Sequence, residues 1–241
     1  MAGRYVALLR GINVGTAKRV AMSALRALVE ELGYSEVRTL LNSGNVVFTA
    51  ARLPAFRRSA APTPAAQGAE PREAALRIQE ALEAKLGVSA RVTVISAEEL
   101  VEVMRGTPWA AGAGAPKERS AGNPLGKVAD NPSRLLVGIL GDPADREKLE
   151  EIARKDWGKE RIALGAARSG AQGSGGKGKE RAGTGGAGVG GGARAVYMWM
   201  PQGVIESKLN AAVSRALGDR VTSRNWATML KLKEMTEEGE G

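Results

Sequence analysis

Hydrophobic residues in the first part of the chain follow the pattern of a strand and then of a helix. Residues 4–10 form a short apolar run that closes in a glycine-rich turn at residues 11–15, which predicts a buried strand. Gly33 stands where a left-handed residue commonly ends a helix. The segment before it predicts that helix, because its apolar residues repeat at helical spacing: Met22, Leu25, Leu28, Val29 and Leu32.

The next apolar segments predict a hairpin, a second helix and a fourth strand. Apolar runs at residues 37–41 and 46–49 flank a link of Asn, Ser and Gly residues, which favours a β-hairpin. An amphipathic stripe then ends at Gly87, and residues 91–95 alternate as in a strand. The resulting order, β-α-β-β-α-β, is that of the ferredoxin-like motif, in which one antiparallel sheet carries both helices on one face.

The second half of the chain begins in the same way. A strand is expected at residues 134–140, a helix follows it, and two more strands are expected at residues 161–164 and 195–200. Two helices complete this half, and we expect Thr222 or Ser223 to cap the last of them.

We therefore expect an α+β protein built from two tandem ferredoxin-like (βαββαβ) halves with antiparallel sheets. The N-terminal lobe spans residues 1–106 with an Ala/Pro-rich insertion at 51–72, and a connector spans 107–132. A similar C-terminal lobe spans 133–241 with a Gly-rich insertion at 165–194. Both insertions have the low complexity of surface loops, which cost little entropy to lengthen.

The net charge of +9 and the pI near 10 invite a nucleic-acid interpretation, but the location of the charge weakens it. The insertion at 51–72 holds four arginines against one glutamate, and that at 165–194 holds five basic residues against one glutamate. The two insertions therefore carry +7 of the +9. The expected folded body carries about +2, which is ordinary for its size.

Composition also removes several classes of chemistry. The chain has no cysteine and no histidine, which excludes disulfides, thiolate nucleophiles, Ser-His-Asp triads and His or Cys metal sites. No carboxylate grouping has metal-ligand spacing, and glutamate pairs such as Glu98 and Glu99 are expected to be solvated on helix surfaces. We expect no metal and no cofactor. Because no apolar run approaches a signal peptide or a membrane span, we expect a cytoplasmic protein without a membrane partner.

Four separated segments carry a specific combination of residues. They read Ala-Leu-Leu-Arg-Gly-Ile-Asn-Val-Gly at 7–15, Leu-Asn-Ser-Gly-Asn-Val-Val-Phe at 41–48, Ser-Lys-Leu at 207–209 and Arg-Asn-Trp-Ala-Thr at 224–228. In order and spacing they resemble a bacterial family catalogued as domain of unknown function number 1697. The resemblance implies a two-lobed α+β fold of similar halves, and it supplies no established activity, substrate or cofactor. The two insertions look longer and more repetitive than the family pattern.

The turn after the first strand is the best candidate for a phosphate site. Arg10, Asn13, Gly15 and Lys18 lie at and just beyond the end of this strand, where a Gly-rich turn lets backbone N–H groups approach an anion. The turn lacks the full spacing of a P-loop or a dinucleotide fingerprint. We therefore favour the structural interpretation, in which Arg10 pairs with a carboxylate and the glycines permit the turn.

Further candidates stand on the hairpin and near the C-terminal end. Ser43 and Asn45 are most often turn formers, but they could share one side of the sheet with Arg10 and Asn13 and form a polar pocket. The remaining ligand-binding candidates are Lys208, Arg224 and Asn225. We expect Ser207 to cap a helix rather than to act as a nucleophile beside Lys208, and Trp109, Trp157 and Trp199 to pack.

Three hypotheses about function remain open. The first is a non-catalytic binding module that holds an anionic small molecule, such as a nucleotide or phosphoester, in a cleft between the lobes; nucleic acid is the weaker choice of ligand. The second is a small transferase or hydrolase in which Lys208 or Tyr197 handles the proton. The third is a structural or interaction protein. The oligomeric state does not follow from the sequence.

Overall fold

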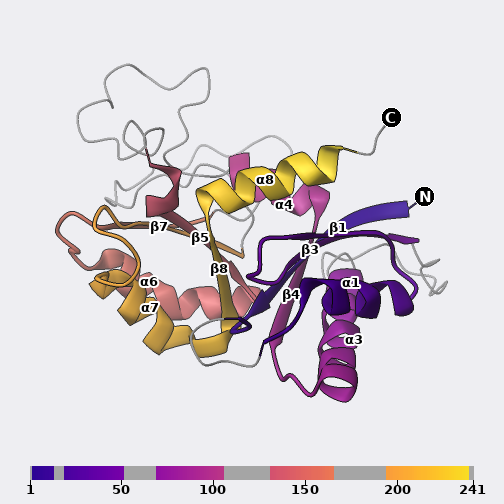
Figure 1. The fold of residues 1–241 in the computed structure, drawn as a ribbon. Helices are drawn as coiled ribbons and strands as arrows, with labels where there is room; N and C mark the ends of the chain where they lie inside the picture. Colours follow the sequence, from indigo (N-terminus) through magenta and orange to yellow (C-terminus); the bar gives the residue numbers. More distant parts are fainter. Residues whose placement is uncertain (1, 14–18, 52–68, 106–130, 166–193, 239–241) are drawn as a thin grey trace, which may run out of the picture.

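Two four-stranded antiparallel sheets and their helices make up the structure, a computed structural model that describes residues 2–13, 19–51, 69–105, 131–165 and 194–238 (Figure 1). The expected α+β class is thereby confirmed, and two ferredoxin-like halves agree with it. Gly15, Lys18, Trp109 and most of the connector and of the two insertions lie outside the described residues.

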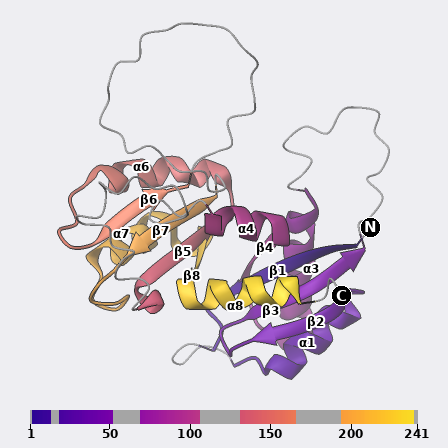
Figure 2. The ribbon, with the colours of Figure 1, turned by 90° about the horizontal axis from the view of Figure 1, so that it is seen from above.

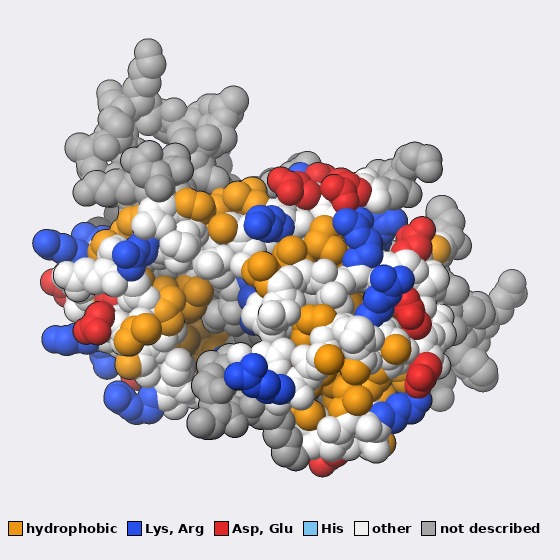
Figure 3. All heavy atoms as spheres, viewed as in Figure 1, with side chains coloured by type: hydrophobic (Ala, Val, Ile, Leu, Met, Phe, Trp, Pro, Cys, Tyr) orange, Lys and Arg blue, Asp and Glu red, His pale blue; other side chains and the backbone are white. Residues whose placement is uncertain are grey.

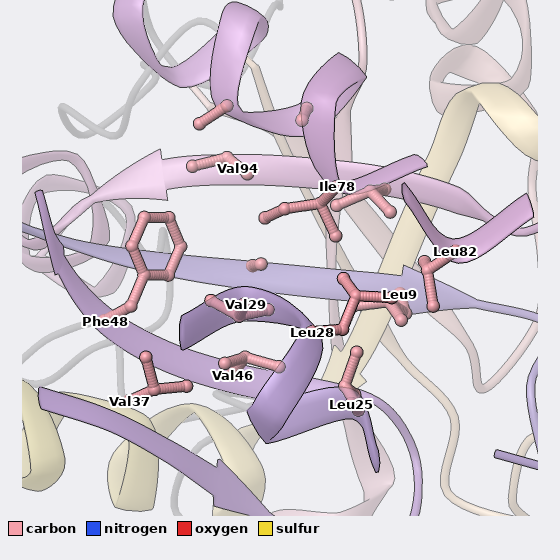
Figure 4. Close-up of a cluster of buried hydrophobic side chains, with 14 of the residues drawn as sticks. Leu9, Leu25, Leu28, Val29, Val37, Val46, Phe48, Ile78, Leu82 and Val94 are labelled. Atoms are coloured by element: carbon pink, nitrogen blue, oxygen red, sulfur yellow. The ribbon is translucent and has the colours of Figure 1, made fainter. Parts of the chain in front are cut away.

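The first sheet has the strand order β2-β3-β1-β4. Its strands and its two helices, all predicted from the sequence, are β1 (Ala2–Arg10), α1 (Met22–Glu31), β2 (Ser35–Leu40), β3 (Asn45–Ala51), α3 (Ala69–Leu86) and β4 (Arg91–Ser96). Both helices cover the same face of the sheet. Figure 4 shows the core between them, where Phe48, Val46 and Leu9 of the strands meet Leu28 of α1 and Ile78 of α3.

Local sequence signals account for the ends of these elements. Gly33 has φ +88° and donates its N–H to the carbonyl of Glu30, which ends α1 in the left-handed conformation expected for a helix terminus. Gly87 ends α3 in the same way at φ +60°. The turn between β2 and β3 places Gly44 at φ +74°, a conformation that an L-amino acid rarely adopts.

The second sheet has the order β6-β7-β5-β8. Its elements are η2 (Pro132–Arg134), β5 (Leu135–Leu140), η3 (Pro143–Arg146), α6 (Glu147–Arg154), β6 (Arg161–Leu164), β7 (Ala195–Trp199), α7 (Lys208–Leu217), η4 (Gly218–Arg220) and β8 (Val221–Asn225). The helices α6 and α7 pack on one face, over a core that includes Leu149, Val196 and Val213.

One prediction in this half was wrong. Thr222 and Ser223 do not cap the last helix, because they lie within β8, and α8 (Trp226–Glu237) is instead capped by Asn225. The Asn225 Oδ1 accepts a hydrogen bond from the Thr228 backbone N–H at 2.9 Å. The strand pairs with β5, and Thr222 faces Ile139 across the ladder.

A layer of two helices joins the sheets. The helices α4 (Ala97–Arg105) and α8 contact each other and lie across both sheets, as Figures 1 and 2 show. One hydrophobic cluster unites residues from all these elements: Val6 and Leu8 of β1, Leu100 and Val103 of α4, Val137 of β5, Tyr197 of β7 and Met229 of α8. Ser96 caps α4, since its Oγ accepts from the Glu99 backbone N–H at 3.1 Å. The domain boundaries stay a prediction.

One edge strand of each sheet approaches the other sheet, and we call the region where they meet the junction. Strand β4 is one of the two outer strands of the first sheet, and β8 is one of the two outer strands of the second. The hydroxyl groups of Thr93 on β4 and Thr222 on β8 share a buried hydrogen bond of 3.0 Å. Polar groups next to this contact are the candidates for a functional site.

Candidate functional site

Arg224 on β8 connects the second sheet to the hairpin of the first. Its Nε donates to the Asn45 Oδ1 at 2.5 Å, and its Nη2 donates to the carbonyl oxygens of Leu9 at 2.6 Å, Ser43 at 3.0 Å and Gly44 at 3.3 Å. Arg224 is therefore engaged by the protein and is not a solvated surface side chain. The guanidinium group joins the end of β1, the β2–β3 turn and β8.

Arg224 stays charged at neutral pH in spite of its burial. Burial, and after it the positive charge of Arg10, lower the pKa of Arg224 to about 10. Arg10 itself makes a second bridge between the sheets, since its Nη1 donates to the Val221 carbonyl at 2.5 Å. The expected carboxylate partner of Arg10 was therefore wrong, because the acceptor is a backbone carbonyl at the start of β8.

Asn13 and Asn45 complete this polar cluster. The Asn13 Nδ2 donates to the carbonyls of Val20 and Asn42, both at 2.9 Å, and its Oδ1 accepts from the Val20 N–H at 2.8 Å. The Asn45 Nδ2 donates to the Leu40 carbonyl at 2.9 Å and to the Ser43 Oγ at 3.0 Å. The fold thus brings the candidates of β1, the hairpin and β8 together, and their hydrogen bonds go to the protein itself. Their role as ligand contacts stays a prediction.

Two candidates lie apart from this cluster. Asn225 is engaged as the cap of α8. Lys208 is exposed at the start of α7, on the face of the second sheet opposite to the joining layer. The expected cap at Ser207 is confirmed, since its Oγ accepts from the Asn210 N–H at 2.9 Å.

Tyr197 is enclosed in the joining layer. Its side chain is 0% exposed, and its hydroxyl donates to the Val103 carbonyl at 2.6 Å. Burial raises the pKa of Tyr197 far above its usual range. A hydroxyl group with this partner and this pKa holds its proton, so the geometry does not support proton transfer by Tyr197.

A cavity of about 790 Å³ lies between the two sheets, where α3 and β4 of the first sheet face the loop after β5 of the second. Its polar lining is basic. The described residues that line it are Pro71, Arg72, Ala75, Leu76, Gln79, Arg91, Val92, Thr93, Val94, Gly141, Asp142, Pro143, Ala144, Asp145, Arg194 and Arg220. Within the described residues, no cluster of acidic side chains is placed to hold a metal ion, and no helix is long and apolar enough to cross a bilayer.

The four arginines of the cavity differ in how far they are engaged. Arg194 donates from Nε to the Leu140 carbonyl at 2.8 Å, and its Nη1 lies 3.3 and 3.4 Å from the two carboxylate oxygens of Glu99. Arg220 donates from Nε and Nη2 to carbonyls at the end of α7. Among the described residues, neither Arg72 nor Arg91 has a hydrogen-bond or ion-pair partner, and both side chains are exposed.

The acidic groups of the cavity are already paired. The Asp142 carboxylate accepts from the Ala144 N–H at 2.9 Å and caps η3. The buried Asp145 carboxylate lies 2.6 Å from the Lys148 Nζ and 3.5 Å from the Arg220 Nη1. Among the described residues, neither carboxylate forms an ion pair with Arg72 or Arg91.

Glu99 departs from the expectation of a solvated carboxylate. Its side chain is only 23% exposed and pairs with Arg194 behind the cavity. Burial raises the pKa of Glu99, and the neighbouring Arg194 partly opposes this shift. The prediction failed because the partner stands 95 residues away along the chain.

Antiparallel pairing places another cation beside the cavity. Arg10 at the end of β1 is the direct ladder partner of Arg91 at the start of β4. Side chains of such partners project on the same face of the sheet, so the two guanidinium groups together raise the positive electrostatic potential there. This pairing also follows from the predicted topology, in which β1 lies antiparallel to the fourth strand. It is the one signal in the sequence that could have revealed Arg91.

Sequence reasoning missed the cavity for an identifiable reason. Arg72 and Arg194 had been counted with the low-complexity insertions, whereas both belong to the described structure and line the cavity. Arg220 follows Gly218, the glycine that ends α7, in a stretch without any recognisable motif.

The comparisons with known proteins bear on family and fold. The sequence model of a family described as protein of unknown function (DUF1697) matches residues 2–62. The predicted resemblance is confirmed over that segment. A solved structure, that of the conserved bacterial protein SP0830 from Streptococcus pneumoniae, is similar to this chain with a TM-score of 0.60 and 16% identity. The alignment covers 99% of this chain and 100% of that one, and at this identity it supports the fold alone. No curated protein sequence matches the chain.

Proposed function

We propose that this protein binds an anionic small molecule in the cavity between the two sheets, with Arg91 and Arg72 as the main contacts. The observation that carries the proposal is the pair of guanidinium groups without partners among the described residues, in a cavity whose own carboxylates are engaged. An arginine fork presents several N–H donors in a plane and matches the oxygens of a phosphate or carboxylate. The proposal concerns binding and includes no chemical step.

Charge and size support this proposal. Four arginines against two aspartates give the lining a formal charge of +2. A phosphate monoester carries about −1.5 to −2 at neutral pH and so matches this excess. The volume of about 790 Å³ falls in the range of roughly 300–1,000 Å³ that is usual for small-molecule sites.

The charges of the described residues on one face of the molecule favour a small anion over nucleic acid. Figure 3 shows Lys and Arg side chains dispersed among Asp and Glu side chains on the face that it presents, without a continuous basic stripe. A nucleic-acid site usually needs such a stripe to follow the backbone phosphates. The basic residues of the cavity are instead concentrated around one hollow.

The proposal is tested by titrating the full chain with inorganic phosphate in an isothermal calorimeter at low ionic strength. We expect wild type to bind and Arg91→Gln to bind about tenfold or more weakly, because a charge-assisted hydrogen bond contributes about 1.5–3 kcal/mol. Arg215→Gln is the matched control, since Arg215 is an exposed arginine of α7 that does not line the cavity. Absence of binding by wild type, or equal affinities of wild type and Arg91→Gln, would contradict the proposal.

A nucleic-acid arm completes this test. A short single-stranded RNA is titrated in the same buffer. If the RNA binds tightly and phosphate does not, the anion that the protein recognises is a polymer, and the proposal of a small ligand is wrong.

A further inference from the structure

The cavity has one wall of apolar side chains in addition to its arginines. Helix α3 lines the cavity with Pro71, Arg72, Ala75, Leu76 and Gln79, which recur at the spacing of one helix face. Leu76 is 48% exposed, although it is a large apolar residue that points away from the sheet core. An apolar side chain that lines a cavity and remains accessible is available to contact a ligand.

The apolar lining continues beyond the helix. Pro143 and Ala144 of the loop after β5 line the cavity with exposed side chains, whereas the lining residues Val92 and Val94 of β4 are buried in the core of the first sheet. The described lining residues include no aromatic side chain. The site therefore offers aliphatic surface without the flat ring that commonly stacks on a nucleobase.

Hydrogen bonds within the protein orient the neutral polar side chains of the lining, Gln79 and Thr93. The Gln79 Oε1 accepts from the Val92 backbone N–H at 2.8 Å, which covers an N–H group of the edge strand β4 and orients the carboxamide. No described residue accepts a hydrogen bond from the Gln79 Nε2, so this amide adds a donor to the cavity. The Thr93 hydroxyl is engaged with Thr222. The groups that remain available are thus donors, which suit an anionic head group.

We propose that the ligand is a phosphate monoester that carries an unbranched aliphatic chain, with the phosphate at Arg72 and Arg91 and the chain along Leu76. This inference rests on the proposed function and specifies its ligand class. Arg72 and Leu76 stand four residues apart on α3 and are therefore neighbours on the helix surface. A head group held by Arg72 accordingly places the first carbons of the chain beside Leu76.

Two other ligand classes fit the lining less well. A carboxylate carries a single charge, which leaves part of the +2 of the lining uncompensated. A nucleotide has sufficient charge, but its base would meet leucine, proline and alanine side chains rather than an aromatic ring. Both classes belong in the test as comparison ligands.

The experiment measures the affinity of the full chain for methyl phosphate, n-hexyl phosphate, n-hexanoate and AMP by calorimetry. We expect n-hexyl phosphate to bind at least about tenfold more tightly than methyl phosphate, which corresponds to the burial of about two methylene groups. Hexanoate and AMP should both bind more weakly than n-hexyl phosphate.

Variants of Leu76 connect this preference to the apolar wall. Leu76→Ser should reduce the ratio of hexyl to methyl affinity to about threefold or less. Leu76→Met should retain the preference, because methionine is apolar and adaptable. Leu230→Ser is the matched control, since Leu230 is 40% exposed on α8 and does not line the cavity.

The outcomes separate this inference from the proposed function. If methyl phosphate binds in an Arg91-dependent manner but the hexyl chain adds no affinity, the proposed function holds and the aliphatic ligand class is wrong. If AMP binds more tightly than n-hexyl phosphate, or Leu76→Ser retains the full preference, the assignment of the chain to the α3 wall is also wrong. If none of the phosphates binds, the proposed function itself is overturned.

Discussion

Substitution of Arg224 by methionine tests whether this buried cation is a structural link between the two sheets. Methionine retains an unbranched apolar side chain and removes every donor of the guanidinium group. The carbonyls of Leu9 and Ser43 and the Asn45 Oδ1 would then lose the donors that they share with β8. The methionine side chain matches that of Arg224 only as far as Nε, so the substitution keeps the apolar stem and removes the guanidinium group together with its hydrogen bonds and its charge.

The magnitude follows from two opposing contributions. Three of the bonds, at 2.5, 2.6 and 3.0 Å, are short, and hydrogen bonds to charged groups contribute about 2 kcal/mol each, or about 6 kcal/mol together. Burial and the nearby charge of Arg10 together lower the pKa of Arg224 from 12.5 to about 10, so holding the charge in this position costs about 3 kcal/mol. We therefore expect Arg224→Met to lower the free energy of unfolding by about 3 kcal/mol.

The assay is urea denaturation at pH 7, followed by circular dichroism and by tryptophan fluorescence. Arg215→Met serves as the control, because Arg215 is exposed on α7, and surface substitutions usually change stability by about 0.5 kcal/mol or less. A loss below about 1 kcal/mol for Arg224→Met would refute the reasoning. In that case the hydrogen bonds of Arg224 would merely compensate the cost of burying its charge.

Two further predictions concern a tight turn and a buried carboxyl group. Gly44→Ala should lower the free energy of unfolding by about 3 kcal/mol, because Gly44 has φ +74° and an added Cβ would lie 2.7 Å from the Leu9 Cβ. Gly87→Ala should lower it by only about 1 kcal/mol, because Gly87 has φ +60° and an added Cβ there would have no neighbour within 4 Å. Equal losses of stability in thermal denaturation would contradict the packing argument. Burial raises the pKa of Glu99 above the ordinary value of 4.5 that applies in the unfolded chain. The folded chain therefore keeps the carboxyl proton of Glu99 at pH values where the unfolded chain has lost it. The contribution of Glu99 to stability consequently falls as the pH rises above 4.5. Glu99→Gln should flatten this fall in a urea series over pH, and an unchanged slope would exclude Glu99 as its source.

The first sheet was predictable because its determinants are local. The period of the apolar residues specified its strands and helices, and Gly33 and Gly87 marked the helix ends by the conformation that they adopt. The strand β8 was missed because its residues at 221–225 are mostly polar. Thr222 and Arg224 are nevertheless directed into the junction, where partners on the first sheet receive them. A polar residue is predicted from the sequence to be exposed when the partner that allows its burial comes from a distant segment of the chain.

The same principle separates the two groups of arginines that the fold brings to the junction. The sequence allowed the inference that Arg10 and Arg224 approach the hairpin, but it could not tell whether their donors would be left over for a ligand. Arg224 donates to four acceptors of the first sheet and its hairpin, so an anion would have to displace bonds that hold the sheets together. Arg91 has no such partner among the described residues and faces a cavity, so an anion there would add bonds without breaking any. An anion should therefore bind at Arg91 in preference to Arg224, although the motif that resembles the family contains Arg224 and not Arg91.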